Sequence, residues 1–478
     1  MGADGSGRPH VVILGAGPAG VGAAFELTRR GIASVTVLEK RNVVGGNAGS
    51  FEVEGVHLDY GSHRLHPACD PEILRDLRDL LGGDLVDRPR HGRIRLQGRW
   101  IHFPLKPVDL VLRLPKRFVL GVALDMARKI LPRPPNDEET FAAVLERGLG
   151  RTICREFYFP YARKLWGLPP DQLAATQARR RVSGSSFRKL IRKLIFTIPG
   201  VKPPGAGHFF YPKRGYGQIS ESLYEAAKNA GGKFLFGASF AAIEHEGGRV
   251  QAVRYDLGGR EHRIPSEHVW STIPINLLIR GLKPEPPADL LEAASRISFR
   301  AMILIYLVLE QDRFSEYDAH YFPEESIPIS RLSEPKNYSA SDEPRGRTVL
   351  CAELPSDPGS QEWKMSDEEL GRVVCSALEQ AGIPVRAPVR SILTRRLSQA
   401  YPVYSADYEE RFAKMDRYVS QIQGLLTFGR QGLFAHDNTH HALYMAYSAA
   451  DCLSRDGNFD WHRWRSFRQI FDTHVVED

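Results

Sequence analysis

The sequence predicts an α/β fold whose parallel-sheet domain is assembled from segments that lie far apart along the chain. The chain opens with a β-branched run at 10–14, a glycine-rich turn, an alanine-rich helix to about Arg30 and a second strand at 34–39. Strand-and-turn signals return at 267–274 ("EHVWSTIP") and at 425–434 ("LLTFGRQGLF"), and a helix is expected to begin near His440. A Rossmann-like domain that is interrupted by a substrate domain accounts for both observations.

The 478 residues are enough for two or three domains. We expect the discontinuous Rossmann-like domain to comprise residues 8–69, 205–275 and 420–455. Residues 70–204 are typical of a mostly helical, basic cap subdomain, with 20 Lys/Arg against 8 Asp/Glu between Ile101 and Pro204. Residues 276–419 are rich in β-type sequence and complete an α+β substrate domain. Their apolar run at 301–309 predicts a buried strand, since a membrane span needs about 20 residues.

Composition indicates a soluble globular protein, with 42% hydrophobic and 25% charged residues. The five cysteines are scattered and contain no C-x-x-C pair, which argues against a disulfide framework or a cysteine zinc site and favours a cytoplasmic location. The basic middle region predicts either an anionic small-molecule partner or a solvated basic face. The segment "FRKLIRKLIF" (187–196) is either a packing helix or a helix that rests on a membrane surface. Nucleic acid is not an expected partner, and the sequence does not indicate an oligomeric state.

The glycine turn is the strongest local signal. Gly15, Gly17 and Gly20 form G-x-G-x-x-G between a strand and a helix, and Glu39 ends the second strand, where it can accept ribose hydroxyls. Gly17 lets the backbone approach a pyrophosphate, which the helix N-terminus stabilises. Dinucleotide binding is therefore expected.

The residues after Glu39 favour FAD over NAD. Arg41, the Gly45-Gly46 pair and Ser50 look like the R-x-x-x-G-G-x-x-x-[ST] extension of FAD proteins, and Gly429-Arg430 looks like their C-terminal segment. A late helix N-terminus can direct N–H groups at the flavin N1–C2=O edge. We expect non-covalent FAD to be bound by Gly15, Gly17, Pro18, Ala19, Gly20, Glu39, Lys40, Arg41, Gly45, Gly46, Asn47, Ser50, Gly61, Ser62, His63, Phe240, Gly429, Arg430, Asn438, His440, His441 and Ala442.

The chain resembles GR2-type flavoproteins of the amine oxidase and protoporphyrinogen oxidase superfamily, and within it the UDP-galactopyranose mutases. Four internal segments carry the closer likeness: "DYGSHRLHP" (59–67), "PYARKLWGLPPDQL" (160–173), "ISRLSEPKNYS" (329–339) and "AYPVYSADYEE" (400–410). The resemblance implies an enzyme whose reduced flavin N5 attacks the anomeric carbon of a nucleotide sugar, after an electron donor has reduced the flavin. It implies His63, Arg331 and Tyr401 as catalytic residues. The substrate residues that it implies are Tyr161, Trp166, Arg180, Arg331 and Tyr401.

One position departs from the mutase pattern. The mutases carry two arginines four residues apart after the Trp-Gly segment; Arg180 matches the first, but Gly184 stands where the second is expected. Arg181 and Arg188 are the candidates to replace it. The alternative function is therefore an FAD-dependent oxidoreductase that moves hydride from a small molecule to flavin N5. A flavin-binding scaffold without catalysis is a third possibility.

His63 and His66 raise the question of a metal pair. No third ligand of suitable spacing lies near them in the sequence, so no metal site is expected. We expect His63 to lie beside the isoalloxazine as a hydrogen-bond donor, and His66 to have a structural role before Pro67.

Overall fold

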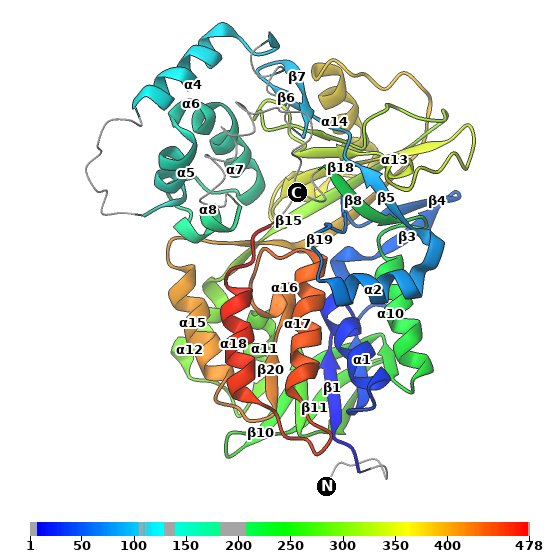
Figure 1. The fold of residues 1–478 in the computed structure, drawn as a ribbon, viewed down its shortest axis with the longest axis vertical. Coiled ribbons are helices and arrows are strands. Elements are labelled where there is room, and N and C mark those ends of the chain that lie inside the picture. The colour runs from blue at the N-terminus through cyan, green and yellow to red at the C-terminus, as the bar shows by residue number, and fades with distance from the viewer. Residues whose placement is uncertain (1–6, 105–108, 110–111, 129–138, 182–206, 477–478) are drawn as a thin grey trace.

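The computed structural model describes residues 7–104, 109, 112–128, 139–181 and 207–476 (Figure 1). The predicted helix at 187–196 and residue Gly184 lie outside the described residues. Among the described residues, no helix combines the length and apolarity that crossing a membrane requires. The five cysteines are free thiols.

A five-stranded parallel sheet forms the predicted Rossmann-like domain. Its order is β20-β13-β1-β2-β9, and all its pairings are parallel. Three stretches of the chain supply the strands: β1 (His10–Leu14) and β2 (Ser34–Glu39), then β9 (Lys233–Phe236) and β13 (His268–Ser271), then β20 (Leu425–Thr427). The expected discontinuous sheet is thus confirmed, whereas the residue numbers of the domain boundaries stay a prediction.

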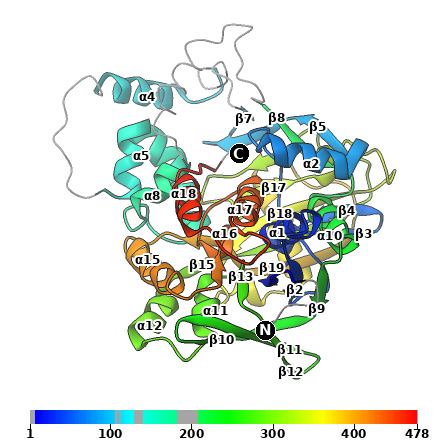
Figure 2. The same cartoon turned by 60° about the horizontal axis from the view of Figure 1, so that its bottom comes forward.

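Two layers cover the parallel sheet. On one face the core includes Val11 and Ile13 together with α1 (Pro18–Arg29), α10 (Gln218–Asn229) and α17 (Thr439–Cys452). On the other face Val12 and Leu14 pack towards β10 (Ala238–Glu246) and β11 (Arg249–Leu257), which continue into β12 (Arg260–Pro265). Figure 2 shows β10, β11 and β12 together near the N-terminus. The remaining elements around this domain are α2 (Pro71–Leu81), α11 (Ile275–Arg280), β14 (Leu282–Lys283), α12 (Ala288–Arg296), α15 (Tyr408–Val419), α16 (Gly429–Gly432) and α18 (Trp461–Phe471).

A seven-stranded sheet forms the second large unit. Its order is β19-β15-β18-β17-β16-β6-β7, with β15 at Ser298–Leu309, β18 at Thr348–Ser356 and β19 at Val389–Val403. The predicted buried strand at 301–309 is confirmed, since every residue from Ala301 to Leu309 is buried. Alternate β15 residues face α14 (Asp367–Gln380) on one side and the hairpin β3 (Ser50–Val53) and β4 (Val56–Asp59) on the other. Shorter elements complete this unit: β16 (Ala319–Tyr321), β17 (Arg331–Ser333) and α13 (Pro335–Ser339).

The described part of residues 70–204 contains strands as well as helices, which corrects the expectation of a mostly helical segment for 85–103. That stretch forms three strands, β5 (Leu85–Pro89), β6 (Gly92–Leu96) and β7 (Arg99–Phe103). β5 pairs with β8 (His208–Pro212), and β6 pairs with β16 of the large sheet. The helices lie beside this sheet (Figure 1): α4 (Lys116–Arg128), α5 (Phe141–Leu149), α6 (Arg151–Ile153), a π-helical turn at Cys154–Tyr158, α7 (Phe159–Trp166) and α8 (Ala175–Arg181).

Candidate active site

A cavity of about 360 Å³ opens at the carboxyl ends of the parallel strands. Gly15 directly follows β1, Glu39 ends β2 and Thr272 directly follows β13, and all three line the cavity. Its opposite wall comes from α7, from β17 and β18, and from the end of β19. This is the edge at which open parallel sheets bind their ligands.

The first glycine turn leaves the start of α1 open. Gly15 has φ +95°, and a Cβ on Gly20 would lie 1.9 Å from the Gly15 carbonyl oxygen, so the turn and the helix can meet only through glycine. A Cβ on Gly17, by contrast, would meet nothing within 4 Å. Gly17 is the N-cap of α1 and no side chain caps that helix, so its first N–H groups are available to an anion in the cavity.

Glu39 and a second glycine turn fix the first turn in place. The Glu39 carboxylate accepts the N–H of Ala16 at 2.8 Å and the N–H of Arg41 at 2.9 Å. The N–H of Gly45 donates to the Ala16 carbonyl at 2.8 Å. A Cβ on Gly46 would lie 3.3 Å from the Gly17 Cα, so the two turns form one cradle of bare backbone.

His63 is a half-buried imidazole whose neutral form is favoured. Its Nε2 lies 2.9 Å from the Asn47 carbonyl oxygen and 3.0 Å from the Tyr60 carbonyl oxygen. Because both partners are acceptors, the hydrogen-bond network assigns the proton to Nε2 and leaves Nδ1 as an acceptor. Burial lowers the pKa of His63 to about 4. The one N–H of this tautomer is engaged by the two carbonyl groups, and the expected donor role of His63 towards a flavin stays a prediction.

Arg331 is held by a buried carboxylate. Nε and Nη2 of Arg331 donate to the two Glu353 oxygens, both at 2.9 Å, in a fork. Oε1 of Glu353 also accepts the backbone N–H of Ser62 at 2.9 Å, which ties the 59–67 loop to the arginine. All three residues line the cavity.

The start of α17 forms another side of the cavity. Asn438 and His441 form a reciprocal capping box at that helix N-terminus, and Asn438 and Ala442 line the cavity. Nη2 of Arg430 donates to the Ala400 carbonyl at 2.9 Å, and its guanidinium carbon lies 5.1 Å from the Tyr401 ring centre. Arg430 thereby orients Tyr401, which also lines the cavity.

Most of the predicted site residues come together in this one cavity. Its wall includes Gly15, Gly17, Pro18, Ala19, Glu39, Lys40, Arg41, Gly46, Asn47, Ser62, His63, Tyr161, Arg331, Tyr401, Arg430, Asn438 and Ala442. Other predicted residues lie outside the described wall: Gly20, Gly45, Ser50, Gly61, Trp166, Arg180, Phe240, Gly429, His440 and His441.

Several residues outside the wall have clear structural partners. Ser50 donates to Asp59 at 2.6 Å and accepts the Gly217 N–H at 2.6 Å, so it anchors the hairpin. Trp166 is buried, with its ring centre 5.6 Å from that of Phe141.

Arg180 lies against the C-terminal segment. It is 3.6 Å from Asp472 and stacks over Tyr404 at 6.0 Å, and its carbonyl accepts the Val476 N–H.

Sequence reasoning missed other residues of the wall. Glu353 lies in an apolar strand that carries no local motif. The place of Gln399 in the wall follows only from the folded structure, in which the Asn47 side chain donates to the Gln399 carbonyl at 3.0 Å. Arg64 could have been predicted as a site residue because it belongs to the segment "GSHRLHP". The only sequence signal for His436 is its position just before the late helix. The full set of missed residues is Ala48, Arg64, Arg90, Leu165, Tyr216, Thr272, Pro274, Tyr321, Glu353, Arg396, Leu397, Ser398, Gln399, Gln431, His436, Asp437, Thr439 and Val476.

These features fit FAD. The uncapped start of α1 and the side-chain-free cradle of Gly17 and Gly46 suit a pyrophosphate, and Glu39 ends β2 beside them. The start of α17 lies on the same cavity, where helical N–H groups stabilise an electron-rich ring edge.

The family of flavin-containing amine oxidoreductases matches residues 18–450. Phytoene dehydrogenase of Streptomyces griseus is 26% identical over 323 residues, which span 60% of this chain and 59% of that protein. Putrescine oxidase of Kocuria rosea is 43% identical over 82 residues, which span 17% of this chain and 16% of that protein. These matches thus cover less than two thirds of either relative's length.

Solved structures share the fold over nearly the whole chain. Reduced UDP-galactopyranose mutase gives a TM-score of 0.79 at 21% identity, over 93% of both chains. Cyclohexylamine oxidase from Brevibacterium oxydans gives 0.64 at 18% identity, over 93% of this chain and 98% of that one. The family match covers most of the chain, and the cavity at the glycine turns fits FAD. The chain therefore belongs to the flavin-containing amine oxidoreductase family and is an FAD-dependent enzyme.

Proposed function

We propose that the enzyme acts on an anionic small molecule of the nucleotide-sugar class, in a reaction like that of the pyranose mutases. The observation that carries the proposal is the basic character of the cavity beside the glycine turns. Two of the acidic residues in the described wall, Glu39 and Glu353, are already engaged by backbone N–H groups or by Arg331. The arginines of the wall are Arg41, Arg64, Arg90, Arg331, Arg396 and Arg430.

Arg331 is the group best suited to the substrate anion. The fork to Glu353 uses Nε and Nη2, and Nη1 donates no hydrogen bond to any residue that the structure describes. A guanidinium in this arrangement can grip a phosphate oxygen while its other edge stays fixed, so little ordering entropy is lost on binding. Glu353 orients the arginine but also offsets part of its charge.

Tyr161 and Tyr401 provide flat surfaces in the same wall. Tyr161 comes from α7 and Tyr401 from β19, so a planar or ring-shaped ligand between them would contact two separate elements. Trp166 supports this wall from behind, since its ring centre is 6.1 Å from that of His436, a residue of the wall.

FAD, when bound, supplies a nucleophilic N5 in its reduced form and a hydride acceptor at the same atom in its oxidised form. The residues of the chain bind and orient the substrate and exclude water. His63 stays neutral above pH 4 and offers an acceptor at Nδ1, so it can receive a hydrogen bond without adding charge beside the cofactor.

An oxidoreductase that acts on an anionic substrate is the second candidate. The position of Arg180 favours it, because this arginine contacts Asp472 and Tyr404 and lies outside the described cavity wall. The names of the curated relatives, phytoene dehydrogenase and putrescine oxidase, also denote oxidoreductases.

Turnover under strictly anaerobic conditions separates the two candidates. The FAD enzyme is reduced with dithionite and incubated with UDP-galactopyranose, and then with GDP- and dTDP-sugars, and the products are separated by chromatography. The proposal expects an isomeric sugar nucleotide with no net change in flavin absorbance, and at least tenfold less product from Arg331→Ala. Arg345→Ala is the matched control, since Arg345 is exposed and pairs with Glu343.

Absence of isomerisation with every sugar nucleotide, together with loss of the 450 nm flavin band when the oxidised enzyme meets an anionic substrate, would sink the mutase proposal in favour of the oxidoreductase.

A further inference from the structure

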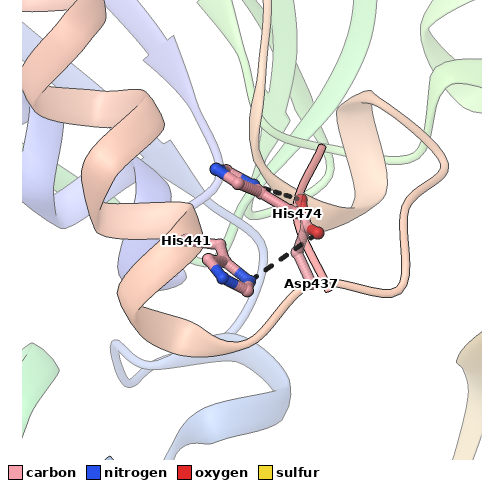
Figure 3. Close-up of side chains that lie close together, drawn as sticks. All are labelled: Asp437, His441 and His474. Atoms are coloured by element: carbon pink, nitrogen blue, oxygen red, sulfur yellow. Dashed lines mark ion pairs between the residues drawn. The ribbon is translucent and has the colours of Figure 1, made fainter. Parts of the chain in front are cut away.

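Three potential metal ligands meet where the C-terminal segment crosses the start of α17 (Figure 3). Asp437 lies two residues before α17, His441 lies in its first turn, and His474 follows α18. One ligand atom of each residue lies within 4.8 Å of the others. Asp437 also lines the cavity, so this cluster lies on the wall of the candidate active site.

The distances in this cluster do not suit hydrogen bonds. Nδ1 of His441 lies 3.8 Å from Oδ1 of Asp437, and Nδ1 of His474 lies 3.6 Å from Oδ2. Hydrogen bonds between such atoms span about 2.7–3.2 Å. Two ligand atoms on one tetrahedral ion lie about 3.3 Å apart, for metal–ligand bonds of about 2.0–2.1 Å. The two spacings between Asp437 and the imidazoles are therefore within about half an ångström of those in a metal site, whereas the widest pair of ligand atoms, up to 4.8 Å apart, would have to close by up to about 1.5 Å.

The carboxylate of Asp437 is otherwise poorly satisfied. Asp437 is 3% exposed, and among the described residues neither of its oxygens accepts a hydrogen bond. Nδ1 of His474 is also buried without a hydrogen-bond partner in the described part of the chain. A buried carboxylate of this kind is costly unless it is paired with a cation or a metal ion.

The donor set selects the class of ion. Two imidazole nitrogens and one carboxylate oxygen suit a divalent first-row transition metal, whereas Mg²⁺ and Ca²⁺ prefer oxygen ligands alone.

Two features oppose a cation here. The charge of Arg180 lies close enough to Asp437 to interact with it, and the N-terminus of α17 adds positive potential. His441 must also give up the N–H of Asn438, which its Nδ1 accepts at 3.2 Å. We expect binding that is specific but weaker than that of a structural zinc site.

The structure assigns a binding site for a divalent transition-metal ion to Asp437, His441 and His474. Such an ion ties the C-terminal segment to the start of α17. The same segment carries Val476, which lines the cavity and donates its N–H to the Arg180 carbonyl at 2.9 Å. Metal binding therefore stabilises the position of this part of the wall. The inference does not depend on which substrate the enzyme uses.

Zinc binding to the full-length, FAD-loaded protein without a histidine tag tests the site. After treatment with EDTA and dialysis, ZnCl₂ is added in competition with a chromophoric chelator, and bound zinc is counted by plasma mass spectrometry, which flavin does not disturb. We expect one zinc per chain and an affinity at least tenfold lower in Asp437→Asn and in His474→Ala. His462→Ala, an exposed histidine on α18, is the matched control. Retained flavin absorbance in each variant shows that it is folded.

Two outcomes overturn the assignment. One is zinc stoichiometry and affinity in His474→Ala equal to those of the unaltered protein, which means that zinc binds elsewhere. The other is no zinc retained beyond the chelator blank, which leaves an ion pair between His474 and Asp437 as the contact that holds the segment.

Discussion

His63 is a cavity residue whose acid–base chemistry the fold changes strongly. Its pKa is lowered to about 4 by burial, from an ordinary value of 6.5. The folded protein therefore binds fewer protons than the unfolded chain between pH 4 and pH 6.5. This contribution to stability is complete above pH 6.5 and is lost as the pH falls towards 4, at a cost of about 3 kcal/mol.

His63→Gln tests this linkage. Glutamine can keep a neutral N–H donor near the two carbonyl groups but does not titrate. We expect the free energy of unfolding, measured in urea at pH 7 and at pH 4.5, to fall less with acid in the variant. Asp59 titrates in the opposite sense, because burial raises its pKa to about 6, but it does so in both proteins and leaves their difference unaffected. Equal pH dependence in the two proteins contradicts the lowered pKa of His63.

Some site residues could be read from the sequence and others could not. Arg331 and His63 stand in short segments with a recognisable pattern, and both line the cavity. Glu353, which holds Arg331, lies in the apolar strand β18, where its function depends on a partner 22 residues away. A contact of that kind is set by strand register, which local patterns do not encode.

At the scale of elements, a pair of glycine variants in the β1–turn–α1 unit tests whether this turn binds the pyrophosphate of FAD. Gly17→Ala adds a methyl group that meets no protein atom, whereas Gly20→Ala drives one into the Gly15 carbonyl. We expect Gly17→Ala to change the stability of the FAD-free protein by about 1 kcal/mol or less. We expect the same variant to weaken FAD binding about fivefold or more, as a clash of about 1–3 kcal/mol with the ligand implies.

The partner variant should behave differently. Gly20→Ala lowers the stability of the FAD-free protein as well, because the clash is internal, and thermal unfolding and FAD titration measure both effects. Gly83→Ala is the control, since its Cβ meets nothing within 4 Å and Gly83 lies outside the described cavity wall. Unchanged FAD affinity in Gly17→Ala would place the pyrophosphate elsewhere.

Elements with strong local periodicity were predictable, and those defined by distant partners were not. The strands His10–Leu14 and Ser34–Glu39 have the predicted bounds, because β-branched runs next to a glycine turn are locally determined. For the strands between 85 and 103 the sequence predicts helix. Two of them are strands through pairing with β8 and β16, which lie more than 100 residues further along the chain.

The whole molecule brings basic side chains from separate units to one cavity. Arg41 and Arg430 come from two distant stretches of the Rossmann-like domain, after β2 and in α16, and Arg331 comes from the large sheet. The position of Arg180 was beyond sequence reasoning for the same reason, since it depends on the C-terminal segment that folds back beside it.

Binding of UDP tests most directly whether this arginine-lined cavity takes a nucleotide-type anion beside FAD. UDP is titrated into the oxidised enzyme while the flavin spectrum and the heat of binding are recorded, for the unaltered protein, Arg331→Ala, Arg331→Lys and Arg345→Ala. The account predicts a saturable flavin shift, at least tenfold weaker binding in Arg331→Ala, an intermediate value in Arg331→Lys and no change in Arg345→Ala. UDP that binds without disturbing the flavin, or with equal affinity in Arg331→Ala, contradicts it.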